Sequence, residues 1–174
     1  MIPRQPMLSA PSSTVSVVVI GIGNELAGDD GAGVVALRQV EKRFSSRCPE
    51  GKQVEFAVLG GDLYSVTDFC YPDRHLLFLD AIAGNRPGEL VTITGDYPAA
   101  LAPSLHQLDI CSVMRSLRQL ELCLPFPSWE VRGITIATPE HLGIGLSRPV
   151  EIAVDELAAT ITGELQEYCH GLPA

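Results

Sequence analysis

Apolar residues fall in short runs that favour β-strands. Residues 14–20 and 75–82 are predominantly apolar without alternation, the pattern of strands buried on both faces of a parallel sheet. Residues 53–58 and 129–137 read as two further strands, because apolar positions recur between polar ones. The run at 89–94 alternates in part, so we expect it to lie at an edge of the sheet and to run antiparallel.

Stretches with apolar residues at helical spacing lie between these strands. They cover residues 34–44, 106–120 and 150–165, and a short helix is predicted at 63–69. Strands that alternate with helices favour a sheet with helices on both faces. The pattern therefore predicts a three-layer α/β/α sandwich around a mostly parallel five-stranded sheet with one antiparallel strand.

Length and charge narrow the class of protein. The 174 residues suit one domain, expected at 15–174 after a flexible tail at 1–14 that is rich in Pro and Ser. The net charge of −9 comes with scattered Arg and Lys, which argues against nucleic acid as a partner. No apolar run approaches the ~18–20 residues of a membrane span. We expect a monomer without a membrane partner.

The five cysteines are dispersed and form no C-x-x-C pair. The first apolar run reads as a core strand rather than as the apolar region of a secretory signal. An odd, dispersed set in such a chain predicts reduced thiols and a cytoplasmic location. Cys70, Cys111 and Cys169 stand among apolar neighbours, so we expect them in the core.

The turn between the first strand and the first long helix reads GIGNELAGDDGAG, over residues 21–33. A dinucleotide-binding turn would need glycine in place of Leu26, and a phosphate loop would need Lys and Ser or Thr in place of Asp29 and Asp30. Two carboxylates suit a cation or a proton rather than a phosphate. Either could instead only cap the following helix, because negative charge is favourable at a helix N-terminus.

Ligands of parallel sheets bind beyond the carboxyl ends of the strands. That rule selects Asp29 and Asp30 after the first strand and Asp62 after the second. Asp80 ends the third strand, where an unpaired carboxylate is costly to bury, so it must cap a loop, pair with a cation or bind a metal. His106 precedes a helix and could reach the same edge, although a lone histidine there is more often a capping or surface residue.

Asp30, Asp80 and His106 together form a set of two oxygen ligands and one nitrogen ligand. Such a set suits zinc or nickel and leaves open positions for a substrate. Spacing alone does not favour this set over one that contains Asp29 or Asp62. No strand–turn–helix elbow surrounds a serine, so a Ser-His-Asp triad is not indicated.

Four segments, GIGNELAGDDGAG, LFLDAI, SLHQLDI and GIGLSRPVE, occur in this order within residues 15–165. As a set they resemble the hydrogenase maturation endopeptidases, which process the large subunit of nickel–iron hydrogenases. The resemblance implies a phosphorylase/hydrolase-like fold and an aspartic-type endopeptidase. It implies metal contacts at Asp30, Asp80 and His106, and catalytic roles for Asp30, Asp80 and Asp29. Some relatives carry Glu at the first metal position, so Asp30 is a shorter variant.

The resemblance also implies an unusual use of metal. Nickel arrives already bound in the large-subunit precursor, is recognised by the three side chains, and a short C-terminal extension of the precursor is then removed. A carboxylate that does not bind the metal, such as Asp29, would serve as the base, and a surrogate divalent metal can occupy the site. Two alternatives stay open: a self-contained metallohydrolase, and a non-catalytic metallochaperone or assembly scaffold.

Overall fold

The computed structural model describes residues 16–45, 48–49, 51–94, 109–122, 124–137 and 143–170. Within these ranges the strands are β1 (Ser16–Ile22), β2 (Val54–Leu59), β3 (Arg74–Ala83), β4 (Leu90–Thr94) and β5 (Ser128–Ile136). The α-helices are α1 (Ala32–Arg43), α2 (Ile110–Gln119) and α3 (Arg148–His170), and the 3-10 helices are η1 (Gly28–Gly31) and η2 (Leu63–Phe69).

These elements match the predicted strands and helices, apart from their ends. The final helix continues to His170 rather than ending near residue 165. The first residues of the helix predicted from 106 fall outside the described residues, and α2 begins at Ile110. Among the described helices, none combines the length and the apolar character needed to cross a membrane.

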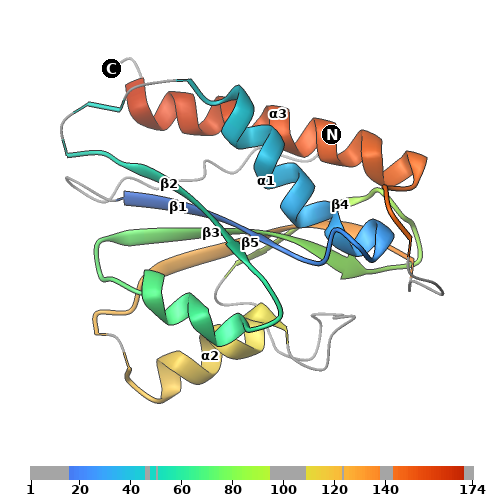
Figure 1. Ribbon diagram of the computed structural model, residues 1–174. Coiled ribbons are helices and arrows are strands. Elements are labelled where there is room, and N and C mark those ends of the chain that lie inside the picture. Colours follow the sequence, from blue (N-terminus) through green and yellow to red (C-terminus); the bar gives the residue numbers. More distant parts are fainter. Residues whose placement is uncertain are drawn as a thin grey trace.

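The strands form one sheet in the order β2-β1-β3-β5-β4. β1 runs parallel to β2 and β3, and β3 runs parallel to β5, whereas β4 pairs antiparallel with β5 at one edge. Figure 1 shows α1 and α3 on one face of the sheet and α2 with η2 on the other. The arrangement confirms the predicted three-layer sandwich with one antiparallel edge strand.

The apolar runs of the central strands supply both layers of the core. Val17 and Leu77 pack in the cluster that includes α1 and α3, whereas Val18 and Leu76 pack in the cluster that includes α2. All four side chains are fully buried. Because successive residues of a strand point to opposite faces, a strand covered on both sides needs apolar residues at every position. This is why β1 and β3 show no alternation.

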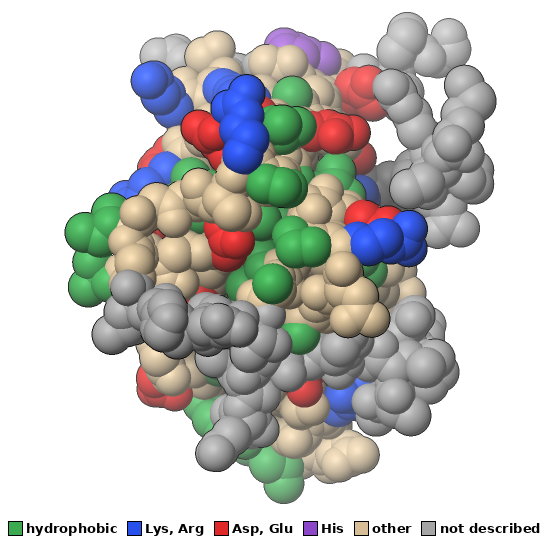
Figure 2. Space-filling view, turned by 90° about the vertical axis from the view of Figure 1, so that its right-hand side faces the viewer, with side chains coloured by type: hydrophobic (Ala, Val, Ile, Leu, Met, Phe, Trp, Pro, Cys, Tyr) green, Lys and Arg blue, Asp and Glu red, His purple; other side chains and the backbone are tan. Residues whose placement is uncertain are grey.

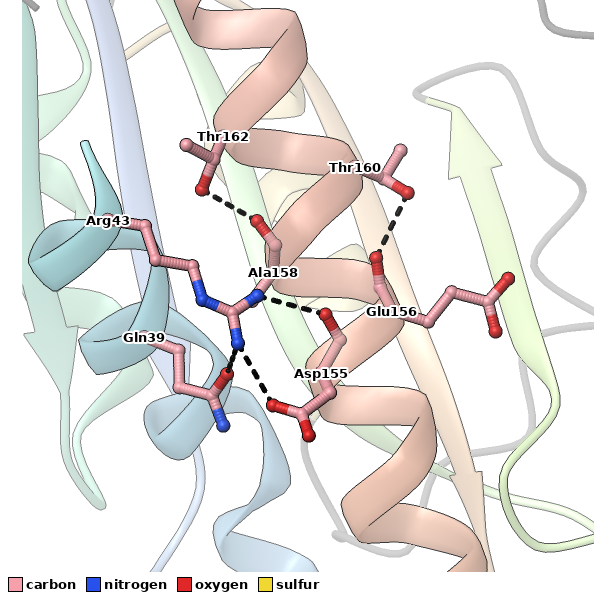
Figure 3. Close-up of polar contacts among 7 residues, drawn as sticks. All are labelled: Gln39, Arg43, Asp155, Glu156, Ala158, Thr160 and Thr162. Carbon is pink, nitrogen blue, oxygen red and sulfur yellow. Dashed lines mark hydrogen bonds and ion pairs between the residues drawn. The ribbon is translucent and has the colours of Figure 1, made fainter.

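Arg43 joins α1 to α3 at the surface. Its guanidinium donates to the backbone oxygen of Asp155 at 3.1 Å, to the Asp155 carboxylate at 3.0 Å, and within α1 to Gln39 at 2.6 Å (Figure 3). On the neighbouring turns of α3, Thr160 and Thr162 donate instead to backbone oxygens four residues earlier in their own helix. Arg43 therefore adds a polar link to the apolar packing of the two helices.

The expectation of reduced thiols is wrong for two of the cysteines. Cys48 and Cys169 form a disulfide across 121 residues of sequence. Cys169 lies in the part of α3 that extends beyond the predicted helix, and this extension brings it to the segment that follows α1. Cys70, Cys111 and Cys169 are buried, which confirms their predicted place in the core.

Candidate active site

A sharp turn carries the chain from Ile22, the last residue of β1, into η1 and α1. Gly23 has a φ of +133°, and a Cβ there would collide with the backbone oxygen of Asp30. A Cβ on Gly33, in the first turn of α1, would collide with the backbone oxygens of Ile22 and Leu79. Because both positions are glycine, the turn folds back on itself and α1 begins directly against the ends of β1 and β3.

Asp30 is buried within this turn, with 6% of its surface exposed. Its Oδ2 accepts a hydrogen bond from the Asn24 backbone N–H at 3.1 Å, and the Asn24 Oδ1 accepts one from the Leu26 N–H at 3.0 Å. These bonds close the loop between β1 and η1 around the carboxylate. A buried carboxylate is costly unless donors or a cation compensate it, so Asp30 is a candidate for contacting a metal.

Asp80 lies near the end of β3, opposite Gly133 of β5. Its Oδ1 accepts a hydrogen bond from the Ala81 N–H at 2.8 Å. Burial raises the pKa of Asp80 to about 7; the Ala81 N–H opposes this rise, and the negative charges of Asp30 and Asp109 add to it. Asp30 and Asp80 therefore lie close enough to repel each other, which favours a proton or a cation between them.

Asp109 is a further carboxylate near Asp80 that the sequence reasoning did not single out. It caps α2, because its oxygens accept hydrogen bonds from the Ser112 backbone N–H at 2.7 Å and from the Ser112 hydroxyl at 2.8 Å. The sequence pattern puts Asp109 inside the helix predicted at 106–120, whereas in the structure Asp109 directly precedes α2 as its cap. Burial, followed by the Asp109 charge, raises the pKa of the Cys111 thiol to about 11, so Cys111 is poorly suited to act as a nucleophile.

Asp29 contacts a different element from its neighbour Asp30. Its Oδ1 accepts a hydrogen bond from the Ser147 backbone N–H at 2.6 Å, and its Oδ2 accepts one from the Ser147 hydroxyl at 2.8 Å. One residue earlier, the Gly28 N–H donates to the backbone oxygen of Gly143 at 2.5 Å. Asp29 therefore joins η1 to the residues that precede α3.

The remaining candidates have other surroundings. Asp62 is exposed and caps η2 by accepting a hydrogen bond from the Tyr64 N–H at 3.0 Å. His106 lies outside the described residues. Within the described ranges, no group of three His, Cys, Asp or Glu side chains could hold a metal ion. The structure thus brings Asp30 and Asp80 together, and the histidine of the expected set stays a prediction.

The carboxyl ends of β1 and β3 point to one side of the molecule, and Figure 2 looks onto that side. Acidic and hydrophobic side chains lie next to one another near the middle of this face (Figure 2). In the two loops joined by Gly28 and Asp29, the large hydrophobic residues Leu26 and Ile144 are 66% and 90% exposed. Carboxylates beside apolar surface suit a polypeptide better than a phosphorylated ligand.

Comparisons with known proteins identify a family for this chain. The family model for hydrogenase maturation proteases (HycI) matches residues 39–164, well over half of the chain. FrxA from Pyrococcus furiosus is 26% identical over 144 residues, which cover 80% of this chain and 98% of FrxA. A putative hydrogenase maturation protease from Methanocaldococcus jannaschii is 25% identical over 128 residues, which cover 67% of this chain and 72% of that protein. The solved structure of the hydrogenase maturating endopeptidase HybD from E. coli matches with a TM-score of 0.66 and 25% identity, over 88% of this chain and 94% of HybD.

Proposed function

This chain belongs to the hydrogenase maturation proteases, and we propose that it removes the C-terminal extension of a nickel-loaded large-subunit precursor of a nickel–iron hydrogenase. Its family and the similar structure make it a hydrogenase maturation endopeptidase. The finer proposal depends on one observation, the two carboxylates Asp30 and Asp80 that repel each other at the carboxyl ends of β1 and β3. Two neighbouring carboxylates favour a cation between them, and we propose that the substrate brings this cation.

We assign the recognition of the nickel to Asp30, Asp80 and His106. Two carboxylates and one imidazole are an incomplete ligand set, and such a set leaves positions for ligands that the precursor itself supplies. In this site the nickel would polarise the peptide carbonyl or a water molecule. A carboxylate that does not contact the nickel would accept the proton from the attacking water.

The alternatives make different predictions. A self-contained metallohydrolase would hold a stoichiometric metal after purification and would cleave short peptides. A metallochaperone or scaffold would bind the precursor without cleaving it. Family and structural similarity to maturation proteases favour the endopeptidase over both.

We further propose that the protein works in the cytoplasm as a monomer. The disulfide between Cys48 and Cys169 bears against this location, because such bonds are uncommon in reducing compartments. Cell fractionation tests the location, and size-exclusion chromatography tests the monomeric state.

The test compares the same large-subunit precursor in a nickel-loaded and a metal-free form. The purified chain is incubated with each, and the mass of the product is measured. We expect a single cleavage near the C-terminus of the nickel-loaded form only. Equal cleavage of the metal-free form, or cleavage of short peptides by a chain that retains stoichiometric zinc, would contradict nickel recognition and favour the self-contained hydrolase. Binding of the precursor without any cleavage would favour the scaffold.

A further inference from the structure

Both oxygens of the Asp29 carboxylate are engaged by a single residue from the far end of the chain. Ser147 lies 118 positions later and donates from its backbone N–H and from its hydroxyl, at 2.6 Å and 2.8 Å. The backbone oxygen of Ser147 in turn accepts the N–H of Glu151, in the first turn of α3. Asp29 is therefore bound to the residue at which the hydrogen bonding of α3 begins.

A second bond reinforces this connection. The Gly28 N–H donates to the backbone oxygen of Gly143 at 2.5 Å, so η1 is tied to two points of the segment 143–147. We call these bonds, from Gly28 to Gly143 and from Ser147 to Asp29, the η1–α3 latch. The far end of the latch is held in place because α3 packs on α1 through the apolar core.

Asp29 and Asp30 point in different directions because they are consecutive in a 3-10 helix, where successive residues are about 120° apart. Asp29 contacts Ser147, while Asp30 accepts a hydrogen bond from Asn24 on its own turn. A movement of Asp29 would nevertheless move Asp30, because η1 is only four residues long. The latch thus fixes where the Asp30 carboxylate lies relative to Asp80.

We propose that Asp29 is a positioning residue, which holds Asp30 in place through the η1–α3 latch, and that it is not the general base. The proposal rests on the proposed endopeptidase function and deepens it, because it removes one of the candidate bases. Both oxygens of the Asp29 carboxylate face Ser147, whereas a general base needs an oxygen within hydrogen-bond reach of the attacking water. A group that only positions needs its hydrogen bonds and not its basicity.

The test depends on a variant that keeps the bonds and loses the base. In Asp29→Asn the amide oxygen can accept the Ser147 N–H and the amide NH2 can donate to the Ser147 hydroxyl, but an amide is not a base. Asp29→Ala removes both bonds, and Ser147→Ala removes one. We expect Asp29→Asn to cleave the nickel-loaded precursor within about 3-fold of wild type. We expect kcat/KM of Asp29→Ala to fall by ~10–100-fold, as is typical when a partner of a metal ligand is lost. The kcat/KM of Ser147→Ala should lie between the values for Asp29→Asn and Asp29→Ala.

The double variant Asp29→Ala/Ser147→Ala should be no worse than Asp29→Ala alone, because residues of one contact are not additive. Asp155→Ala is the matched control, since it loosens the contact of α1 with α3 at Arg43 without touching the latch. If Asp29→Asn is as inactive as Asp29→Ala while both melt at the wild-type temperature, Asp29 is the base and the proposal is wrong.

Amide hydrogen exchange separates this inference from the proposed function. Asp29→Ala should speed exchange in residues 24–31 and 143–147, Asp29→Asn should not, and neither expectation requires activity. Unchanged exchange in Asp29→Ala would overturn the latch. Failure of the wild-type chain to cleave any nickel-loaded precursor would instead overturn the proposed function.

Discussion

The turns that follow β1 and β2 both contain glycine and aspartate, but their aspartates have different surroundings. β1 and β2 are neighbouring parallel strands, and each is followed by glycine and a 3-10 helix, with aspartates inside η1 and at the N-cap of η2. In the first turn Asp30 is buried and repels Asp80. In the second, Asp62 is exposed and only caps η2.

The glycines explain the difference. A Cβ on Gly23 or Gly33 would collide with backbone atoms, whereas the positions of a Cβ on Gly60 and Gly61 have no neighbour within 4 Å. The first turn is therefore folded tightly against the central strands, and the second stands open beside the edge strand β2. Close backbone packing thus buries the acid of the first turn beside a neighbouring strand, whereas the acid of the second turn stays at the surface.

The largest expected effect is on the packing of the first turn. Gly33→Ala should lower the free energy of unfolding by roughly 3–5 kcal/mol, because the new methyl group must displace the backbone of β1 or β3. Gly61→Ala, its matched control, should change it by less than about 1 kcal/mol, because nothing opposes the added methyl group. Urea unfolding followed by circular dichroism measures both. Equal effects of the two substitutions would remove the distinction between the turns.

The next effect concerns pH. The folded pKa of Asp80 is about 7, well above its ordinary value of 3.8, so the folded chain holds an extra proton between these values. The contribution of Asp80 to the free energy of unfolding therefore falls as the pH rises from about 4 to about 7, and it is constant above 7. The measurement uses metal-free protein with a chelator. We expect the free energy of unfolding of Asp80→Asn, relative to that of wild type, to rise by about 1–3 kcal/mol from pH 4.5 to pH 7.5.

Asp62→Asn is the control for this measurement, because an exposed cap should leave the pH dependence of wild type unchanged. Chemical unfolding at a series of pH values provides the data for all three proteins. If the free energy of unfolding of Asp80→Asn depends on pH as steeply as that of wild type, Asp80 does not lie in a desolvated, negatively charged environment.

The smallest effect lies on the outer side of the first turn. Glu25 forms an exposed ion pair with Arg38 of α1, with an N–O distance of 2.8 Å. Glu25→Gln should therefore cost less than about 0.5 kcal/mol, and less still at high salt. A thermal melt with and without 1 M salt checks this, and a loss as large as that of Gly33→Ala would mean that surface charge, and not packing, holds the turn.

Most of the fold could be predicted from the sequence, because the patterns that indicate its strands and helices are local. Unbroken apolar runs in β1 and β3 predicted central parallel strands, and the partial alternation of residues 89–94 predicted the antiparallel edge strand β4. Local signals also placed Asp30 and Asp80 among the candidates, together with Asp29 and Asp62, but only the resemblance to a known family favoured Asp30 and Asp80.

Contacts between distant segments could not be read in this way. The bonds from Ser147 to Asp29 span 118 residues and the disulfide spans 121. No local pattern in the sequence predicts either contact. Asp109 was missed for a related reason, since a capping aspartate looks the same whether or not a second carboxylate lies near it.

The most direct test of the account compares Asp30→Asn, Asp80→Asn and Asp62→Asn on the nickel-loaded precursor. An amide keeps the size of the carboxylate but is a poorer metal ligand, so each change removes charge with little change in shape. We predict that kcat/KM falls by at least ~10–100-fold for Asp30→Asn and Asp80→Asn, and that Asp62→Asn cleaves within about 2-fold of wild type. Full activity of Asp30→Asn or Asp80→Asn, or an equal loss in Asp62→Asn, would contradict the claim that the paired carboxylates at the ends of β1 and β3 are the active site.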